Sequence, residues 1–130
     1  MKILVVDDDT AILEFVDRVL RAAGYTTTLA TDGPEALKVA EEQGPFDLLL
    51  TDVMMPTMNG DKLARQLRLR EPTLKVLYLT GYSDRLFKDK GTLWEGEAFL
   101  DKPCTVNSLL QAVSLLLVGH LPLPSPPSPV

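Results

Sequence analysis

Short runs of consecutive apolar residues set the strongest limit on how this chain can fold. A strand with one face in water alternates apolar and polar residues, whereas a strand buried on both faces is apolar along its length. Three runs are of the second kind: residues 3–6, Leu48–Thr51 and 76–79, with Thr51 as the only polar member. Because strands buried on both faces belong to parallel sheets covered by helices, the runs predict the interior strands of such a sheet.

The segments around these runs supply two further strand patterns and several helical ones. Residues 25–30 alternate and are rich in β-branched side chains, as in an edge strand, and residues 98–100 form a short fifth strand. Asp9 or Thr10 is suited to cap the first helix, Gly24 to end it, and Thr105 to cap the last. The expected helices are 10–23, 34–44, 60–69, 84–90 and Val106–Val118, with the weakest pattern at 84–90.

Five strands alternating with helices predict an α/β fold with a doubly wound parallel sheet. Parallel neighbours need helical crossovers between them, which the alternation supplies. The 130 residues suffice for one domain with a sizeable core, and we place that domain at residues 1–118. Residues 119–130 are rich in proline and serine, so we expect a disordered tail there.

Composition and charge exclude several classes of function. A net charge of −5 leaves no basic surface for nucleic acid. No apolar run approaches the length that spans a bilayer, and the start of the sequence does not have the pattern of a secretory signal. The single cysteine, Cys104, cannot form an internal disulfide, which fits a reducing compartment. We therefore expect a cytoplasmic protein that binds neither nucleic acid nor a membrane directly.

Polar residues with complementary chemistry mark the ends of four predicted strands. Asp7 and Asp8 follow the first strand, Asp52 follows the third, Thr80 follows the fourth and Lys102 comes after the fifth. The carboxyl ends of parallel strands meet at one edge of a sheet, where α/β proteins bind ligands. Clustered carboxylates need a cation, and Mg²⁺ prefers oxygen ligands. The pattern predicts that Asp52 accepts a phosphoryl group with help from a metal ion.

This order of Asp-Asp, Asp, Thr and Lys-Pro at successive strand ends resembles the receiver domain of two-component response regulators, as in chemotaxis receivers, over residues 2–118. The resemblance implies a flavodoxin-like sheet with strand order 2-1-3-4-5. It implies phosphorylation of Asp52 and a magnesium ion held beside it, with Asp8 favoured over Asp7 as a direct ligand. The full expected Mg²⁺ set is Asp7, Asp8, Asp52 and the backbone carbonyl of Met54.

The resemblance assigns roles to further positions. Thr80 would donate a hydrogen bond to a phosphoryl oxygen, and Lys102 would pair with the same group. Phe99 would be the aromatic switch residue coupled to Thr80. The peptide bond between Lys102 and Pro103 would be cis, a form that costs little only before proline. Asp9 is expected to cap a helix or support the acidic residues rather than to bind the metal.

The resemblance also implies partners. A phosphohistidine on a histidine kinase or a histidine phosphotransfer protein would donate to Asp52, and the surface of the fourth helix, fifth strand and fifth helix would then change. That surface would bind an unidentified downstream protein, or a second copy in a homodimer. The chain would catalyse its own phosphorylation and dephosphorylation and turn over no external substrate. Residues 80–84, residues 91–103 and the proline-rich end resemble receivers at the carboxyl end of hybrid sensor histidine kinases, and a single-domain response regulator stays open.

Two other functions fit parts of the pattern. A phosphorylation-independent interaction module would have no use for the complete set of acids, threonine and lysine. Phosphohydrolases with an aspartyl nucleophile resemble a pattern with a second aspartate two positions on, where this chain has Met54, which cannot transfer a proton. Among the remaining residues, Tyr82 is expected to shield the phosphoryl group and prolong its life, Cys104 to be a small buried apolar residue, and His120 not to act as a phosphodonor.

Overall fold

The computed structural model describes residues 1–81, 93 and 95–119, which form one parallel sheet of five strands flanked by helices. The strand order is β2-β1-β3-β4-β5, and every neighbouring pair is parallel. The predicted doubly wound, flavodoxin-like α/β fold is confirmed. The strands are β1 (Lys2–Val6), β2 (Thr26–Ala30), β3 (Leu48–Thr51), β4 (Lys75–Thr80) and β5 (Glu97–Asp101), and the helices are α1 (Thr10–Ala22), α2 (Gly33–Gln43), α3 (Gly60–Arg70) and α5 (Val106–Val118).

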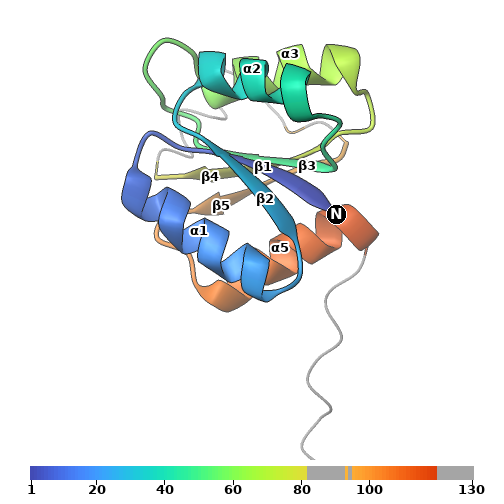
Figure 1. The fold of residues 1–130 in the computed structure, drawn as a ribbon. Coiled ribbons are helices and arrows are strands. Elements are labelled where there is room, and N and C mark those ends of the chain that lie inside the picture. Colours follow the sequence, from blue (N-terminus) through green and yellow to red (C-terminus); the bar gives the residue numbers. More distant parts are fainter. Residues whose placement is uncertain (82–92, 94, 120–130) are drawn as a thin grey trace, which may run out of the picture.

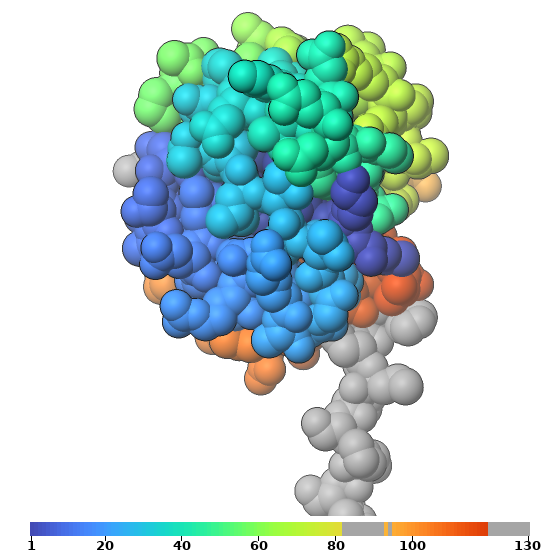
Figure 2. All heavy atoms as spheres, viewed as in Figure 1, coloured from blue at the N-terminus to red at the C-terminus, as the bar shows by residue number. Residues whose placement is uncertain are grey.

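Helices cover both faces of the sheet, and each face has its own apolar core. α1 and α5 lie on one face, and α2 and α3 lie on the other (Figure 1). In β3, Leu49 belongs to the core under α2 and α3, whereas the next residue, Leu50, belongs to the core under α1 and α5. Successive side chains of a strand point to opposite faces. The apolar run therefore reflects burial on both sides, as the sequence predicts, and Figure 2 shows the packed exterior around it.

The helices begin and end at the predicted signals, within one or two residues. Asp9 caps α1, where its Oδ1 accepts a hydrogen bond of 2.9 Å from the N–H of Ala11. Gly24, with φ of 95°, has the left-handed conformation that favours glycine after a helix. Thr105 and Ser108 form a reciprocal capping box at the start of α5. Local sequence therefore fixes these boundaries.

The strands of the sheet end nearly level with one another at their carboxyl edge. Val6 of β1 pairs with Thr51 of β3. On the other side, Thr80 of β4 pairs with Asp101 of β5. Residues that directly follow these pairs are brought to the same edge, which is where ligands bind in open α/β sheets.

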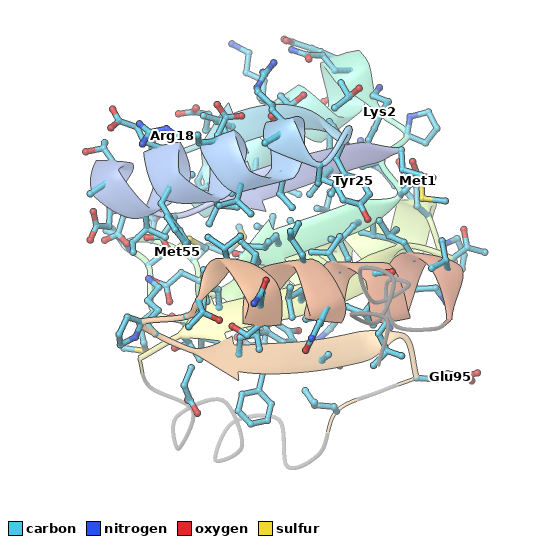
Figure 3. All side chains as sticks on the ribbon, turned by 90° about the horizontal axis from the view of Figure 1, so that it is seen from below. Met1, Lys2, Arg18, Tyr25, Met55 and Glu95 are labelled. Carbon is cyan, nitrogen blue, oxygen red and sulfur yellow. The ribbon has the colours of Figure 1, made fainter. Side chains whose placement is uncertain are left out.

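The face covered by α1 and α5 is seen from below in Figure 3, where Arg18 lies on the outer side of α1. Within the described ranges, no helix is long and apolar enough to cross a membrane. Several expectations lie outside the described residues, so the structure does not bear on them. They are the helix at 84–90, the roles of Tyr82 and His120, and the tail after Gly119.

Candidate functional site

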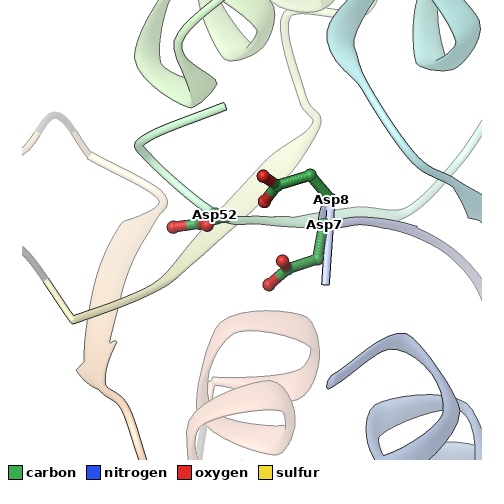
Figure 4. A group of neighbouring side chains, drawn as sticks. All are labelled: Asp7, Asp8 and Asp52. Atoms are coloured by element: carbon green, nitrogen blue, oxygen red, sulfur yellow. The ribbon is translucent and has the colours of Figure 1, made fainter. Parts of the chain in front are cut away.

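The candidate site lies at the carboxyl edge of the sheet, where β1 and β3 end side by side. Asp7 follows β1 directly, and Asp52 follows β3. The backbone N–H of Asp52 donates a hydrogen bond of 3.0 Å to the carbonyl of Val6, which continues the pairing of the two strands to their ends. This register places both carboxylates in one group together with Asp8 (Figure 4).

The three carboxylates form a compact acidic cluster with a buried side and an open side. Each contributes an oxygen atom, and these oxygens lie within 4.8 Å of one another. Asp7 is only 2% exposed and Asp52 only 6%, whereas Asp8 is exposed. A group that enters from solvent therefore meets Asp8 first and the two buried carboxylates behind it.

Lys102, which follows β5, supplies a positive charge to this cluster. Its Nζ lies 2.7 Å from Oδ2 of Asp7 and 3.2 Å from Oδ2 of Asp52. Burial raises the pKa of Asp7 above its ordinary value, although the hydrogen bonds from Lys102 and from the N–H of Asp9 oppose the change. Burial opposes the charge of Lys102, but its contacts with Asp7 and Asp52 outweigh that effect and raise its pKa. Lys102 therefore stays protonated beside the acids.

Backbone contacts fix the orientation of Asp52. Its Oδ1 accepts a hydrogen bond of 2.7 Å from the N–H of Val53, and its carbonyl oxygen accepts one of 2.9 Å from the hydroxyl of Thr51. The N–H of Gly60 donates to the carbonyl of Val53 at 2.8 Å, which closes the loop after β3. A Cβ atom on Gly60 would lie 2.0 Å from the carbonyl oxygen of Asp52. The sequence predicts a helix that begins at Gly60, but it gives no sign of this close approach to Asp52.

The other residues singled out in the sequence lie around this cluster in different ways. Thr80 is fully buried at the end of β4, and its carbonyl accepts a hydrogen bond of 2.9 Å from the N–H of Lys102. The peptide bond between Lys102 and Pro103 is cis. Phe99 is half-buried and packs against the core under α2 and α3, as does Met54. The structure thus gathers Asp7, Asp8 and Asp52 into one cluster, in which Lys102 contacts Asp7 and Asp52, and the backbone of Thr80 is hydrogen-bonded to that of Lys102.

The donor set suits a hard divalent cation. Three carboxyl groups gather beside one ammonium group, so acidic groups outnumber basic ones in the cluster. All three side chains offer oxygen, the ligand atom that Mg²⁺ prefers, and one oxygen of each lies within 4.8 Å of the others. The arrangement can hold such an ion and can present a buried, oriented carboxylate as a nucleophile next to a lysine.

Comparisons with known proteins agree with this geometry. A family model described as the response regulator receiver domain matches residues 3–114. The response regulator MprA of Mycobacterium leprae (strain TN) is 38% identical over 117 residues, which cover 90% of this chain and 51% of that protein. The chain therefore spans about half the length of this relative.

Solved structures show the same likeness. The receiver domain from the hybrid histidine kinase CckA has a TM-score of 0.77 and 36% identity, and the match covers 90% of this chain and 99% of that one. The response regulator TrrA from Thermotoga maritima, solved in complex with Mg(2+)-BeF, has a TM-score of 0.77 and 32% identity. The match covers 89% of this chain and 98% of that one.

The fold and the site together define a phosphoacceptor module of two-component signalling. The chain belongs to the response regulator receiver domain family.

Proposed function

We propose that Asp52 is the residue of this receiver domain that accepts the phosphoryl group. The observation that carries the proposal is the position of its carboxylate, buried at the end of β3 and held 3.2 Å from Nζ of Lys102. One carboxylate oxygen bonds to phosphorus while the bond from phosphorus to the donor's imidazole nitrogen breaks. The electron pair stays on that nitrogen, which takes a proton from solvent. The product is an acyl phosphate on Asp52.

The acidic cluster is the proposed site for Mg²⁺. Asp7, Asp8 and Asp52 would hold it with the backbone carbonyl of Met54, and the spacing of their oxygens supports this assignment. The Mg(2+)-BeF complex of TrrA supports the same choice of metal. When bound, the ion offsets the negative charge that the carboxylates and an incoming phosphoryl group bring together.

Two residues would respond to the new phosphoryl group. Lys102 would transfer part of its pairing from Asp7 and Asp52 to a phosphoryl oxygen, and Thr80 would donate its hydroxyl to another. Phe99 lies on β5, the strand next to the one that ends in Thr80. A shift of Thr80 would reach it through that pairing and change the surface of β5 and α5.

The proposed donor is a phosphohistidine on a histidine kinase or a histidine phosphotransfer protein, acting in the cytoplasm. Membership in the receiver family supports this class of partner. The relatives fit two kinds of protein that could contain this domain. MprA is a response regulator about twice as long as this chain, and the CckA receiver comes from a hybrid histidine kinase. We also propose that the surface changed by phosphorylation binds a downstream protein or a second copy of this chain in a homodimer.

Intact mass spectrometry after incubation with acetyl phosphate tests the proposal. Wild type, Asp52→Asn and Asp101→Asn are compared with Mg²⁺ and with EDTA. Asp101 is an exposed carboxylate next to Lys102 and so serves as the matched control. We expect one phosphoryl group on wild type and on Asp101→Asn, dependent on Mg²⁺, and none on Asp52→Asn. Phosphorylation of Asp52→Asn at the wild-type level, or none on wild type, would refute the assignment and favour a binding module that does not need phosphorylation.

A further inference from the structure

A groove of about 620 Å³ lies between α2 and α3, on the face of the sheet opposite α1 and α5. The two helices lie side by side there (Figure 1). Among the described residues, the groove is lined by Leu37, Lys38, Glu41, Gln66, Leu69 and Arg70. None of these side chains belongs to the acidic cluster, so the proposed phosphoryl transfer gives the groove no role.

The α3 wall of the groove carries the most exposed of the large apolar side chains in the described residues. Leu69 is 82% exposed, whereas Leu37 on the α2 wall is half-buried and packs against the core. A single exposed leucine is common on protein surfaces and says little by itself. Here two leucines line one groove, so a partner that fills the groove would remove both from water.

The exposed charges of the two helices differ in sign. On α3, the exposed charged side chains are all basic: Lys62, Arg65 and Arg70. On α2, three acids and one base are exposed: Glu35, Glu41, Glu42 and Lys38. Within the described part of the chain, no ion pair joins an acid of α2 to a base of α3. These charges therefore remain free to pair with another molecule.

The direction of the helices decides how two copies could meet on this face. α2 and α3 run in the same direction, because each follows a strand of one parallel sheet. A two-fold axis in the plane of the contact and parallel to the helices would place α2 of one copy against α3 of the other. A two-fold axis across the helices would place α2 against α2, so the acids would face one another. Charge favours the first arrangement.

The two helices also match in length, which sets the pairs across such a contact. Each has 11 residues, so positions equally far from the two starts lie level with one another. Glu35 is third in α2 and meets the partner's Lys62, which is third in α3. Glu41 is ninth in α2 and comes within one helical turn of the partner's Arg70. By symmetry, each of these opposite-charge pairs occurs twice.

We propose that α2 and α3 bind a second copy of this chain in a symmetric dimer, with Leu69 of each copy in the groove of the other. One like-charged pair, Lys38 with the partner's Arg65, is outnumbered by the two pairs of opposite charge. The contact lies on the face of the sheet opposite α5. It is therefore distinct from the surface of β5 and α5 in the proposed function, and it needs no phosphorylation.

Analytical ultracentrifugation in EDTA, without a phosphodonor, tests the proposal. The samples are wild type, Glu41→Arg, Arg70→Glu and an equal mixture of these two variants. Each variant alone would place like charges at both symmetric contacts, whereas a dimer with one copy of each variant would have opposite charges at both. Glu14→Arg is the matched control, because Glu14 is an exposed acid of α1 on the other face.

We expect wild type and Glu14→Arg to dimerise with equal dissociation constants, and each single variant at least about tenfold more weakly. The mixture should return to within about threefold of wild type, which also shows that both variants fold. A mixture that associates no better than the single variants, or equal weakening by Glu14→Arg, would overturn the proposal. Wild type that stays monomeric at about 0.5 mM would overturn it in favour of a different protein as the occupant of the groove.

A leucine variant tests the apolar part of the contact. Leu69→Gln should weaken dimerisation at least about tenfold, because the buried side chain becomes polar. Leu115→Gln changes a leucine of α5 that is 50% exposed, and it should match wild type. Equal dissociation constants for Leu69→Gln and wild type would contradict the placement of Leu69 in the groove. Since no phosphodonor is present, failure of the proposed function at Asp52 would leave these results unchanged.

Discussion

Nζ of Lys102 lies 2.7 Å from Oδ2 of Asp7, although 95 positions separate the two residues in the chain. Asp7 is 2% exposed, so this ammonium offsets a buried negative charge. The same nitrogen contacts Asp52. Lys102 therefore stabilises the folded chain before any phosphoryl group is present, and it would compete with the proposed Mg²⁺ for the carboxylates.

The substitution Lys102→Met keeps a side chain of similar length and removes the positive charge of its ammonium group. We expect the free energy of unfolding in EDTA to fall by about 1–3 kcal/mol, because a buried carboxylate loses its partner. Added Mg²⁺ should then stabilise the variant more than wild type, since the acidic cluster has become more negative. Urea unfolding with and without Mg²⁺ measures both effects. An equal gain from Mg²⁺ in the two proteins would contradict competition between Lys102 and the ion.

Gly60→Ala places a methyl group where there is no room for it. Its Cβ would lie 2.0 Å from the carbonyl oxygen of Asp52, so the loop after β3 must move. We expect a loss of about 1–3 kcal/mol in unfolding free energy and slower phosphorylation by acetyl phosphate, because Asp52 moves with the loop. Gly81→Ala is the matched control for stability: no atom of the described residues lies within 4 Å of its added Cβ. Chemical denaturation should leave Gly81→Ala within about 0.5 kcal/mol of wild type.

The pair of Asp17 and Thr27 should make stability depend on pH. The hydroxyl of Thr27, assisted by Arg21, holds the pKa of Asp17 below its ordinary value of 3.8. A lowered pKa in the folded chain contributes stability above the ordinary value, and this contribution is lost as the pH falls through the lower one. Asp17→Asn should therefore cost about 0.5–1.5 kcal/mol at neutral pH and progressively less in acid.

The substitution Thr27→Val keeps the shape of the side chain and removes its hydroxyl, so it tests whether the Thr27 hydrogen bond causes this pH dependence. It should remove most of the pH-dependent difference between wild type and Asp17→Asn in urea unfolding. A difference that persists unchanged in the Thr27→Val background would assign the effect to Arg21 instead, since Arg21 also donates to Asp17 at 2.7 Å.

Arg68 of α3 ties that helix to the start of β5. Its guanidinium donates to the carbonyls of Leu74 at 2.8 Å and Glu95 at 3.0 Å, and it lies 3.8 Å from the fully buried carboxylate of Glu97. Arg68→Met should lower the unfolding free energy by about 1–3 kcal/mol, because the part-buried carbonyl of Leu74 loses its donor and the buried carboxylate of Glu97 loses its nearby positive charge. Arg65→Met, an exposed change on the same helix, should stay within about 0.5 kcal/mol. Comparable losses in both variants would contradict the specific role of Arg68.

The sequence predicts the features that depend on neighbouring residues. The apolar run Leu48–Thr51 predicts a strand buried on both faces, and Asp9 predicts the start of the first helix, because each signal is local. The strand-end positions of Asp7, Asp8, Asp52 and Lys102 predict their meeting, because the carboxyl ends of parallel strands share one edge. The structure brings these four side chains together.

Features that depend on tertiary packing cannot be predicted from such patterns. The contact between Arg68 and Glu97 requires the position of α3 over β4 and β5, and Arg68 in the sequence looks like any surface arginine of a helix. The close approach of Gly60 to Asp52 arises from the path of the loop between them. The pocket of about 230 Å³ lined by Ile12 of α1 and by Cys104 after β5 depends on how these segments pack, which no local pattern encodes.

The position of β1 in the sheet has a consequence for synthesis of the protein. β1 pairs with both β2 and β3, so the first 52 residues already contain three adjoining strands and all three carboxylates. Lys102 comes later in the chain, and a ribosome makes the acids before the base. A nascent chain therefore lacks the ammonium group that contacts Asp7 and Asp52 until β5 joins the sheet. Only a chain that includes β5 and Lys102 can place the Asp52 carboxylate beside that lysine.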